Sequence, residues 1–506
     1  MFKSAGALAA ATQVGIAAPV ELGPKLYESI GVRPIINARG TFTIITGSQT
    51  LPEVKKAMDE ASRHFVQLDE LMEAVGKRLA ELTKAEWGIV TSGCCAALTH
   101  FTAAAIAGFN PERMQRLPDV TGLRDEVIIP AYSRNEYDHA IRMLGVKVKT
   151  VSDMAALQAA ASDRTALIYI LAGPNDDGPL GTKAISEFAR TKNIPVIVDA
   201  AAEVLTIPNV HLERGASAVA YSGGKCIRGP QAAGLLLGDK RLLRSAWINS
   251  APHHAFGRSL KVGKEEIMGM LTAVEMWTKR DHAAEWREWE RRLEVISSRL
   301  KSIDGVTTEV RQPSKDLSNR TPNLQIRWEG SQLGITGEEV HKHLYDTEPR
   351  IVLASGSGRR PASMKSSVSV VPYMMMPGEE KIVADRLHAV LSRPPKIEAP
   401  AEPKGDLANV AGQWDVKFDF GPGSVTHMLS FEQDGTKLSG THKGEFDSGQ
   451  LNGSVMGNAV RFRSFVPTIG KRVGFDFTGT ASGDRLTGTV DLGEYGNTTF
   501  TAQKRA

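Results

Sequence analysis

Between Trp87 and Leu237, short apolar runs recur along the chain and are separated by stretches of mixed polarity. The runs occupy residues 87–91, 127–130, 166–171, 194–198 and 232–237, and a segment of alternating polarity lies at 147–151. Short apolar runs bounded by turn residues are typical of strands buried on both faces, and the stretches between them have the spacing of helices. Strands that alternate with helices form parallel sheets. The pattern therefore predicts an α/β fold, with a mostly parallel sheet that helices cover.

The pattern changes after residue 260. Residues 261–393 contain a long charged helix, several short strands and two further helices, which indicates a small α+β domain. Residues 394–404 are a proline-rich linker, and residues 405–506 consist of short alternating runs separated by Gly, Asp and Asn. Such runs are typical of a small antiparallel barrel or sandwich. We therefore expect a large domain at residues 23–260, followed by the small domain, the linker and an all-β domain.

The first 22 residues are treated as a leader. They contain one lysine, a weakly apolar alanine-rich run and small residues around Ala17 and Ala18. This composition is typical of an export signal, and it resembles the tail of a twin-arginine signal although the arginine pair is absent. The leader favours export to the periplasm, with a cytoplasmic protein as the alternative. No later stretch is apolar for long enough to span a bilayer, so no membrane span is expected.

Composition narrows the function further. The 506 residues are 42% apolar and 23% charged, with a formal net charge of +4. These are ordinary values for a globular protein, and a charge of this size gives no large basic surface for nucleic acid. The three cysteines (Cys94, Cys95 and Cys226) form neither a disulfide framework nor a metal-ligand spacing. Nucleic-acid binding and metal catalysis are therefore not expected.

An acid stands at the end of a predicted strand, and a lysine follows later in a turn bounded by glycines. Asp199 follows the apolar run 194–198, and Lys225 lies in a turn between glycines. Pyridoxal phosphate (PLP) needs a lysine amine for its aldehyde and a carboxylate that keeps its ring nitrogen protonated. Ser222, three residues before the lysine, can donate to the cofactor phosphate. A surface lysine is the alternative, but a solvated helix face poorly explains a lysine between glycines and two apolar runs. Asp199 and Lys225 are therefore the predicted catalytic residues.

A phosphate loop is predicted upstream of these two residues. The run 87–91 turns through Ser92 and Gly93 into an alanine-rich helix that begins near Cys94. The start of a helix presents free backbone N–H groups and the positive end of its dipole, which together hold phosphate. Ser92, Gly93 and Cys94 are therefore the predicted phosphate contacts. Cys94 is expected to be a small packing residue rather than a nucleophile.

The segment YSGGKCIRGPQAAGLLLG, residues 221–238, closely resembles the lysine segment of the selenocysteine synthase (L-seryl-tRNA selenium transferase) superfamily. That superfamily includes D-glucosaminate-6-phosphate ammonia-lyase. The resemblance continues in RPIINARG, residues 33–40, and in Tyr132-Ser133-Arg134, and covers about residues 25–393. It implies the type I aminotransferase fold, PLP held as a Schiff base by Lys225, and a homodimer or larger homo-oligomer.

The same resemblance implies further substrate residues. Asn37 lies in a segment that passes the cofactor in this family, although a plain turn asparagine explains it equally well. Arg134 belongs to the family's Ser-Arg segment, and Arg359 lies where relatives bind a substrate carboxylate. The side chain that stacks on the PLP ring comes from residues 132–139. Tyr132, Tyr137 and His139 are candidates by their chemistry, and Arg134 is another by the family's Ser-Arg segment.

The predicted function is a PLP-dependent lyase that carries out β-elimination on an amino acid or an amino sugar acid, as the ammonia-lyase branch of the superfamily implies. Selenium transfer to seryl-tRNA is the first alternative. Neither an RNA-binding domain nor a basic stripe supports it. Racemase or aldolase chemistry stays open, as does a protein without catalytic activity whose all-β domain binds a ligand.

Overall fold

The computed structural model describes residues 21–358, 365–397, 406–421 and 423–505. The predicted leader therefore lies almost wholly outside the described residues, as does most of the linker. The contacts of the chain divide it into two compact units. The first contains residues up to Gly40, Ala284–Gln312 and Thr321–Pro395, and the second contains Thr41–Ala283, Pro313–Arg320 and the residues from Lys396 onward.

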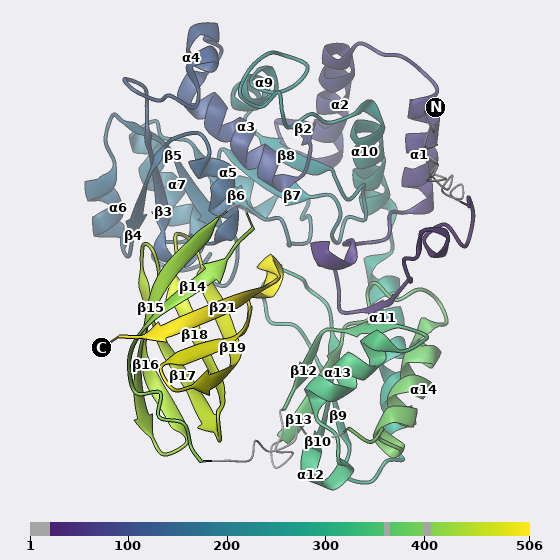
Figure 1. The fold of residues 1–506 in the computed structure, drawn as a ribbon. Helices are drawn as coiled ribbons and strands as arrows, with labels where there is room; N and C mark the ends of the chain where they lie inside the picture. The colour runs from purple at the N-terminus through teal and green to yellow at the C-terminus, as the bar shows by residue number, and fades with distance from the viewer. Residues whose placement is uncertain (1–20, 359–364, 398–405, 422, 506) are drawn as a thin grey trace, which may run out of the picture. The chain divides into compact units, whose positions relative to one another are not determined.

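A seven-stranded sheet forms the centre of the second unit (Figure 1), in the order β2-β8-β7-β6-β5-β3-β4. The strands are β2 (Trp87–Thr91), β3 (Glu126–Pro130), β4 (Lys147–Val151), β5 (Thr165–Leu171), β6 (Val196–Asp199), β7 (Ala218–Ser222) and β8 (Gly234–Gly238). β8 is antiparallel to β7 and to β2, and all other pairs are parallel. The predicted α/β fold with a mostly parallel sheet is confirmed.

Helices pack against this sheet. They are α1 (Pro52–Ser62), α2 (Leu68–Thr83), α3 (Cys94–Ala107), α4 (Pro111–Arg116), α5 (His139–Arg142), α6 (Met154–Ala160), α7 (Thr182–Thr191), α8 (Val210–Glu213), α9 (Lys240–Ile248) and α10 (Lys264–Lys279). β2, β3 and β8 are buried at every position, which explains why they read as unbroken apolar runs. α3 is buried on nearly all sides and contacts five of the strands. Its many alanines allow it to lie close to the sheet.

The first unit is smaller and has an antiparallel sheet in the order β12-β13-β10-β9. Its elements are β9 (Thr307–Arg311), β10 (Asn323–Glu329), β12 (Ser355–Ser357), β13 (Lys365–Val370), α11 (His282–Leu300), α12 (Gly330–Leu333), α13 (Gly337–Asp346) and α14 (Glu379–Ser392). β1 (Ile36–Ala38) pairs in parallel with β11 (Ile351–Leu353) in the same unit. From their place in the sequence, residues 36–38 were assigned to the large domain. In the structure they pair with a strand of the unit that contains the small domain.

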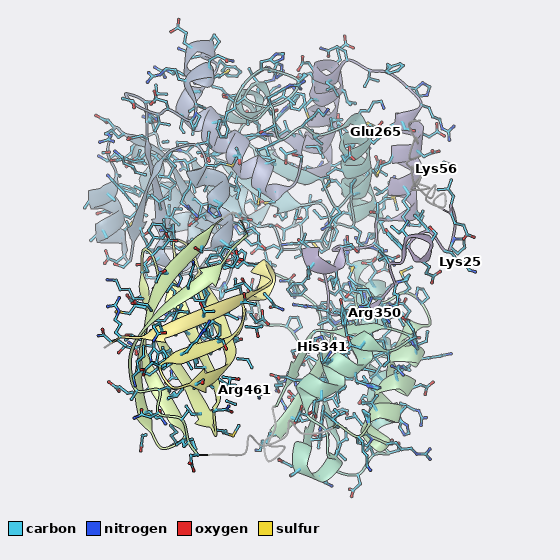
Figure 2. All side chains as sticks on the ribbon, in the orientation of Figure 1. Lys25, Lys56, Glu265, His341, Arg350 and Arg461 are labelled. Atoms are coloured by element: carbon cyan, nitrogen blue, oxygen red, sulfur yellow. The ribbon has the colours of Figure 1, made fainter. Side chains whose placement is uncertain are left out.

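The all-β region is a closed barrel of eight antiparallel strands, β14 to β21. Its strands are β14 (Gly412–Asp419), β15 (Ser424–Asp434), β16 (Lys437–Lys443), β17 (Ser448–Met456), β18 (Ala459–Pro467), β19 (Arg472–Ser482), β20 (Arg485–Asp491) and β21 (Asn497–Lys504). Alternate residues face the interior: Val460 and Phe462 are buried, while Arg461 between them, labelled in Figure 2, is exposed. Of the two predicted architectures, barrel and sandwich, the structure has the barrel.

Three polar side chains form a hydrogen-bonded chain inside the barrel. Ser464 Oγ lies 2.6 Å from His442 Nδ1, and His442 Nε2 lies 2.9 Å from His427 Nδ1. The rings of Phe475 and Phe477 lie against His442, with centroids 4.8 and 5.9 Å away. Burial, followed by the neighbouring His427, lowers the pKa of His442 from 6.5 to about 3.

This pKa predicts that the barrel loses stability in acid. The unfolded chain binds a proton at His442 near pH 6.5, whereas the folded barrel binds it only near pH 3. Neutral His442 therefore contributes its full stabilisation above pH 6.5, and this contribution falls as the pH decreases. By about pH 5 the loss is about 2 kcal/mol. The measurement is the urea midpoint of barrel unfolding, read from peptides released by brief proteolysis. His442→Gln should flatten its pH dependence, and equal slopes in the two proteins would contradict the assignment.

Among the residues that the structure describes, no helix is long and apolar enough to cross a lipid bilayer.

Candidate active site

The strand registers bring several predicted site residues to one edge of the main sheet. Thr91 at the end of β2 and Ser222 at the end of β7 are both paired with Gly234, the first residue of β8. On the other side of β7, Asp199 is paired with Ala220. Asp199, Ser222 and the start of α3 therefore lie at the same edge, where open α/β sheets bind their ligands.

Asp199 is held by hydrogen bonds on both carboxylate oxygens. Tyr169 on β5 donates its hydroxyl to Asp199 Oδ2 at 3.0 Å, and the backbone N–H of Ala201 donates to Oδ1 at 3.1 Å. The Cys94 thiol also donates to Oδ1, at 3.5 Å. Asn135 Nδ2 in turn donates to the Tyr169 hydroxyl at 3.1 Å. The carboxylate is only 3% exposed, and these donors fix its position and satisfy its charge.

The neighbours of Asp199 remain protonated. Burial, followed by the negative charge of Asp199, raises the pKa of the Tyr169 hydroxyl well above its usual value. The same two causes raise the pKa of the Cys94 thiol, and the charge of Lys225 lowers it in part. Both groups therefore act as donors to Asp199 near neutral pH. Cys94 packs as a thiol, which agrees with the role expected from the sequence.

Close backbone contacts shape the loop that carries Lys225. The N–H of Gly223 donates to the carbonyl of Ala233 at 2.8 Å, and the N–H of Gly229 donates to the carbonyl of Gly223 at 2.8 Å. A Cβ on Gly223 would lie 2.8 Å from the Ala233 oxygen, and one on Gly224 would lie 2.1 Å from Gln231 Oε1. Only glycine fits at these two positions.

Lys225 itself is half-buried. Within the described chain its amine takes part in no hydrogen bond and no ion pair, whereas the other charged group of the site, Asp199, accepts three hydrogen bonds and keeps one acceptor site on Oδ2. Since the charges of both residues act on the Cys94 thiol, both lie within electrostatic range of the start of α3. The amine is therefore available for a covalent bond at the edge that Asp199 occupies.

The start of α3 is a suitable phosphate cradle. Gly93 is its N-cap residue with φ 88°, and no side chain caps the helix there. A Cβ on Gly234 would lie 2.4 Å from the carbonyl carbon of Gly93, so the two backbones are in close contact. The Ser92 hydroxyl donates to the carbonyl of Leu260 at 2.8 Å. The first N–H groups of α3, rather than the Ser92 hydroxyl, are thus the donors that a phosphate would use.

Two of the predicted substrate residues have hydrogen-bond partners within the protein. Arg134 donates to Asp138 Oδ2 at 2.6 Å and to Thr150 Oγ1 at 2.7 Å, and Asp138 is fully buried. In the first unit, Asn37 closes its own turn: its amide donates to the carbonyl of Gly40 at 3.0 Å and its Oδ1 accepts from two backbone N–H groups. Arg359 lies outside the described residues.

The three aromatic candidates for stacking on the cofactor ring differ in their surroundings. The Tyr132 hydroxyl donates to the carbonyl of Leu180 at 2.6 Å, and His139 is exposed at the start of α5. Tyr137 is 55% exposed. Its pKa is raised mainly by burial of part of the ring and further by Glu136, Cys95 and Asp199. Tyr132, Tyr137 and His139 therefore all stay candidates.

Tyr169 and Asn135 are site residues that the sequence did not single out. Tyr169 is the one hydroxyl-bearing residue in the middle of the apolar run TALIYIL. A buried tyrosine hydroxyl requires a hydrogen-bond partner, so its position was a usable signal. The partner is Asp199, because Leu171 of β5 is paired with Asp199 of β6.

Comparisons with known proteins agree with this geometry. Residues 53–321 match the family model Aminotransferase class-V. The chain is 27% identical over 380 residues to D-glucosaminate-6-phosphate ammonia lyase of Salmonella typhimurium, a match that covers 72% of this chain and 98% of that protein. The solved structure of a D-glucosaminate-6-phosphate ammonia-lyase superposes with a TM-score of 0.63 at 26% identity, covering 73% of this chain and 98% of the other.

Two further relatives carry different names. 5'-C-glycyluridine monooxygenase-decarboxylase of a Streptomyces species is 30% identical over 308 residues, which is 58% of this chain and 75% of that protein. L-seryl-tRNA(Sec) selenium transferase of Proteus mirabilis is 27% identical over 104 residues, or 18% of this chain and 21% of the other. The resemblance to the ammonia-lyase and selenium transferase superfamily is thereby confirmed, and the family match ends before the barrel.

Proposed function

Since the chain belongs to the aminotransferase class-V family, we propose that it is a PLP-dependent lyase that acts by β-elimination on an amino acid or an amino sugar acid. Its relatives and its fold make it a PLP-dependent enzyme. The observation that carries the proposal is the buried Asp199, fixed by Tyr169 at the sheet edge that also carries Lys225. The reaction type rests on the similarity to the ammonia lyase, 98% of whose length is covered by the match.

The residues at this edge fit PLP in number and in chemistry. The uncapped start of α3 offers backbone N–H donors for a phosphate, and Lys225 offers an amine without a partner in the described chain. Asp199 is a carboxylate whose neighbours are all donors, so it is the acceptor for a protonated ring nitrogen. An opposite charge next to that nitrogen favours its protonated form.

When bound, PLP supplies an electron-withdrawing ring that stabilises negative charge at the substrate Cα. Asp199 keeps a proton at the ring nitrogen, and Tyr169 keeps the carboxylate oriented. The Lys225 amine would take the proton from Cα and could return it to the group that leaves Cβ. Hydrolysis of the resulting enamine then releases the substrate nitrogen as ammonia. The start of α3 orients the cofactor throughout.

The test is an assay of the purified, PLP-loaded protein against a panel of amino acids and amino sugar acids, with and without a phosphate group. The proposal expects release of ammonia together with a 2-oxo acid that lacks its Cβ substituent. Inversion at Cα without ammonia would show a racemase instead, and aldehyde release would show an aldolase. A protein that shows no visible absorbance after incubation with PLP would contradict an enzyme of this family.

Replacement of Tyr169 tests the support of Asp199. Tyr169→Phe removes one donor from a buried carboxylate, and hydrogen bonds to charged groups contribute about 1.5–3 kcal/mol. We expect roughly tenfold weaker PLP binding, measured by titrating the visible absorbance. Tyr221→Phe is the matched control, because this buried tyrosine on β7 bonds Asn209 rather than Asp199. Equal effects of the two substitutions would show a general packing loss and no special role for Tyr169.

A shortened chain tests whether the barrel is separable. A chain that ends at Lys396 should fold and bind PLP, because Asp199, Lys225 and α3 all precede the linker. The measurement is solubility and visible absorbance after incubation with PLP, beside the full chain. A soluble shortened chain that binds PLP but has lost activity on the substrate would assign the barrel to substrate selection. An insoluble or colourless chain would contradict separability.

A further inference from the structure

A cavity lies at the edge of the main sheet opposite to the edge that carries Asp199. Val196, the first residue of β6, lines it, whereas Asp199 is the last residue of the same strand. The cavity has a volume of about 720 Å³ and is bounded by the end of α3, by α7 and by the start of α9. This volume lies in the range of about 300–1,000 Å³ that is usual for small-molecule sites.

The charged side chains around this cavity are mostly positive. Arg124, Arg190 and Arg241 line it. In the described part of the chain, none of these three guanidinium groups takes part in a hydrogen bond or an ion pair. The one acid in the lining, Asp239, caps α9 by accepting the N–H of Leu242 at 2.8 Å. The cavity therefore has an excess of unneutralised positive charge.

The walls of the cavity also hold two serine hydroxyls without partners. Ser186 on α7 is 2% exposed, Ser245 on α9 is 3% exposed, and neither Oγ atom has a hydrogen-bond partner. A Cβ on Gly215 would lie 2.9 Å from Arg190 Nη2 and 3.2 Å from Ser186 Cβ. The Arg190 guanidinium thus lies over Gly215, beside Ser186. Both Oγ atoms have almost no accessible surface, so these serines lie beneath the cavity wall, Ser186 behind the Arg190 guanidinium.

One side of the cavity is apolar. Ala104, Ala105 and Phe109 line it at the end of α3, and Phe109 is 51% exposed. An exposed aromatic ring next to three arginines suits a ligand that has both a charged group and an organic part. Solvated surface arginines are the plain alternative, but three arginines around one cavity of this volume, beside an exposed aromatic ring, favour a ligand.

We propose that this cavity binds a small phosphorylated organic molecule, separately from the active site. Arg124, Arg190 and Arg241 pair with its phosphate oxygens. The organic part rests against Phe109. The site requires neither PLP nor Lys225, so the inference does not depend on the lyase reaction.

The test is calorimetric titration of the PLP-loaded protein with inorganic pyrophosphate at low salt. The loaded protein is used because its bound cofactor occupies the phosphate cradle at α3. We expect saturable binding that weakens as salt is added, because ion pairs of exposed arginines are screened. Arg190→Gln and Arg241→Gln should each weaken binding roughly tenfold. Adenosine diphosphate should bind more tightly than pyrophosphate, and Phe109→Ala should remove the difference.

Arg287→Gln is the matched control, since Arg287 is an exposed arginine on α11 that does not line the cavity. It should leave pyrophosphate binding unchanged, and turnover should be unchanged in all the arginine variants. The inference is overturned if the loaded protein does not bind pyrophosphate at low salt. It is equally overturned if Arg190→Gln and Arg241→Gln bind as the control does. Failure of the lyase assay with binding intact would affect only the proposed function.

Discussion

Replacing Lys225 with alanine is expected to remove nearly all turnover while the fold remains intact. The amine provides the covalent bond to PLP and the base that moves the Cα proton, and general acid–base catalysis alone is worth about a hundred- to ten-thousand-fold. The side chain is half-buried and contributes little packing, so the thermal midpoint should change only slightly. Turnover and a borohydride-reducible link to PLP at residue 225, detected by peptide mass spectrometry, are the two measurements.

Two further substitutions separate the amine from the charge. Lys225→Arg keeps the positive charge but lacks a nucleophilic amine, so it should be nearly as inactive as Lys225→Ala. Lys192→Ala removes an exposed lysine after α7 and should leave turnover unchanged. A reducible link that persists in Lys225→Ala would show that another lysine holds the cofactor.

Local sequence signals were sufficient for the two central residues. Asp199 could be predicted because it is an acid directly after an apolar run. Lys225 could be predicted because it lies among glycines, and close backbone contacts require glycine at those positions. Both signals depend only on neighbours in the chain. For the same reason the parallel sheet and the all-β region were predictable, since their periodicities are local.

Features that depend on which strands are neighbours were not readable. Tyr169 reaches Asp199 because β5 lies beside β6, a fact that no pattern within either strand reports. β1 pairs with β11, so Asn37 lies beside Val352, which is more than 300 positions later in the chain. Order along the chain gives no hint of such a pairing.

Arg134 illustrates a different limit. Its position in the Ser-Arg segment predicts a substrate contact, and this stays a prediction. In the structure its guanidinium donates to Asp138 and Thr150. The spacing of four residues between Arg134 and Asp138 was visible in the sequence. That Asp138 is fully buried, and so holds both Arg134 and Arg142, was not visible. Burial decides whether a charged pair is structural or free for a ligand.

The second large effect is expected for Asp199→Asn, which should lower turnover by roughly a hundred- to a thousandfold, as when one electrostatic partner of a reacting centre is removed. An amide cannot hold the charge that keeps the ring nitrogen protonated. The amide also fits the hydrogen bonds poorly. In one orientation the new Nδ2 faces the N–H of Ala201, and in the other it faces the Tyr169 hydroxyl, which then has to accept instead of donate.

Three measurements distinguish loss of charge from loss of structure. Asp199→Glu keeps the charge on a longer side chain and should recover part of the turnover that Asp199→Asn loses. Asp125→Asn is the matched control: Asp125 precedes β3 at the opposite edge of the sheet, where Arg164 pairs with it, and it is similarly buried. This substitution should lower the thermal midpoint and leave turnover nearly unchanged. In Asp199→Asn the pKa of the Cys94 thiol should fall, because one of the causes that raise it is removed. Near-normal turnover in Asp199→Asn, together with a lowered thiol pKa, would show that another group partners the ring nitrogen.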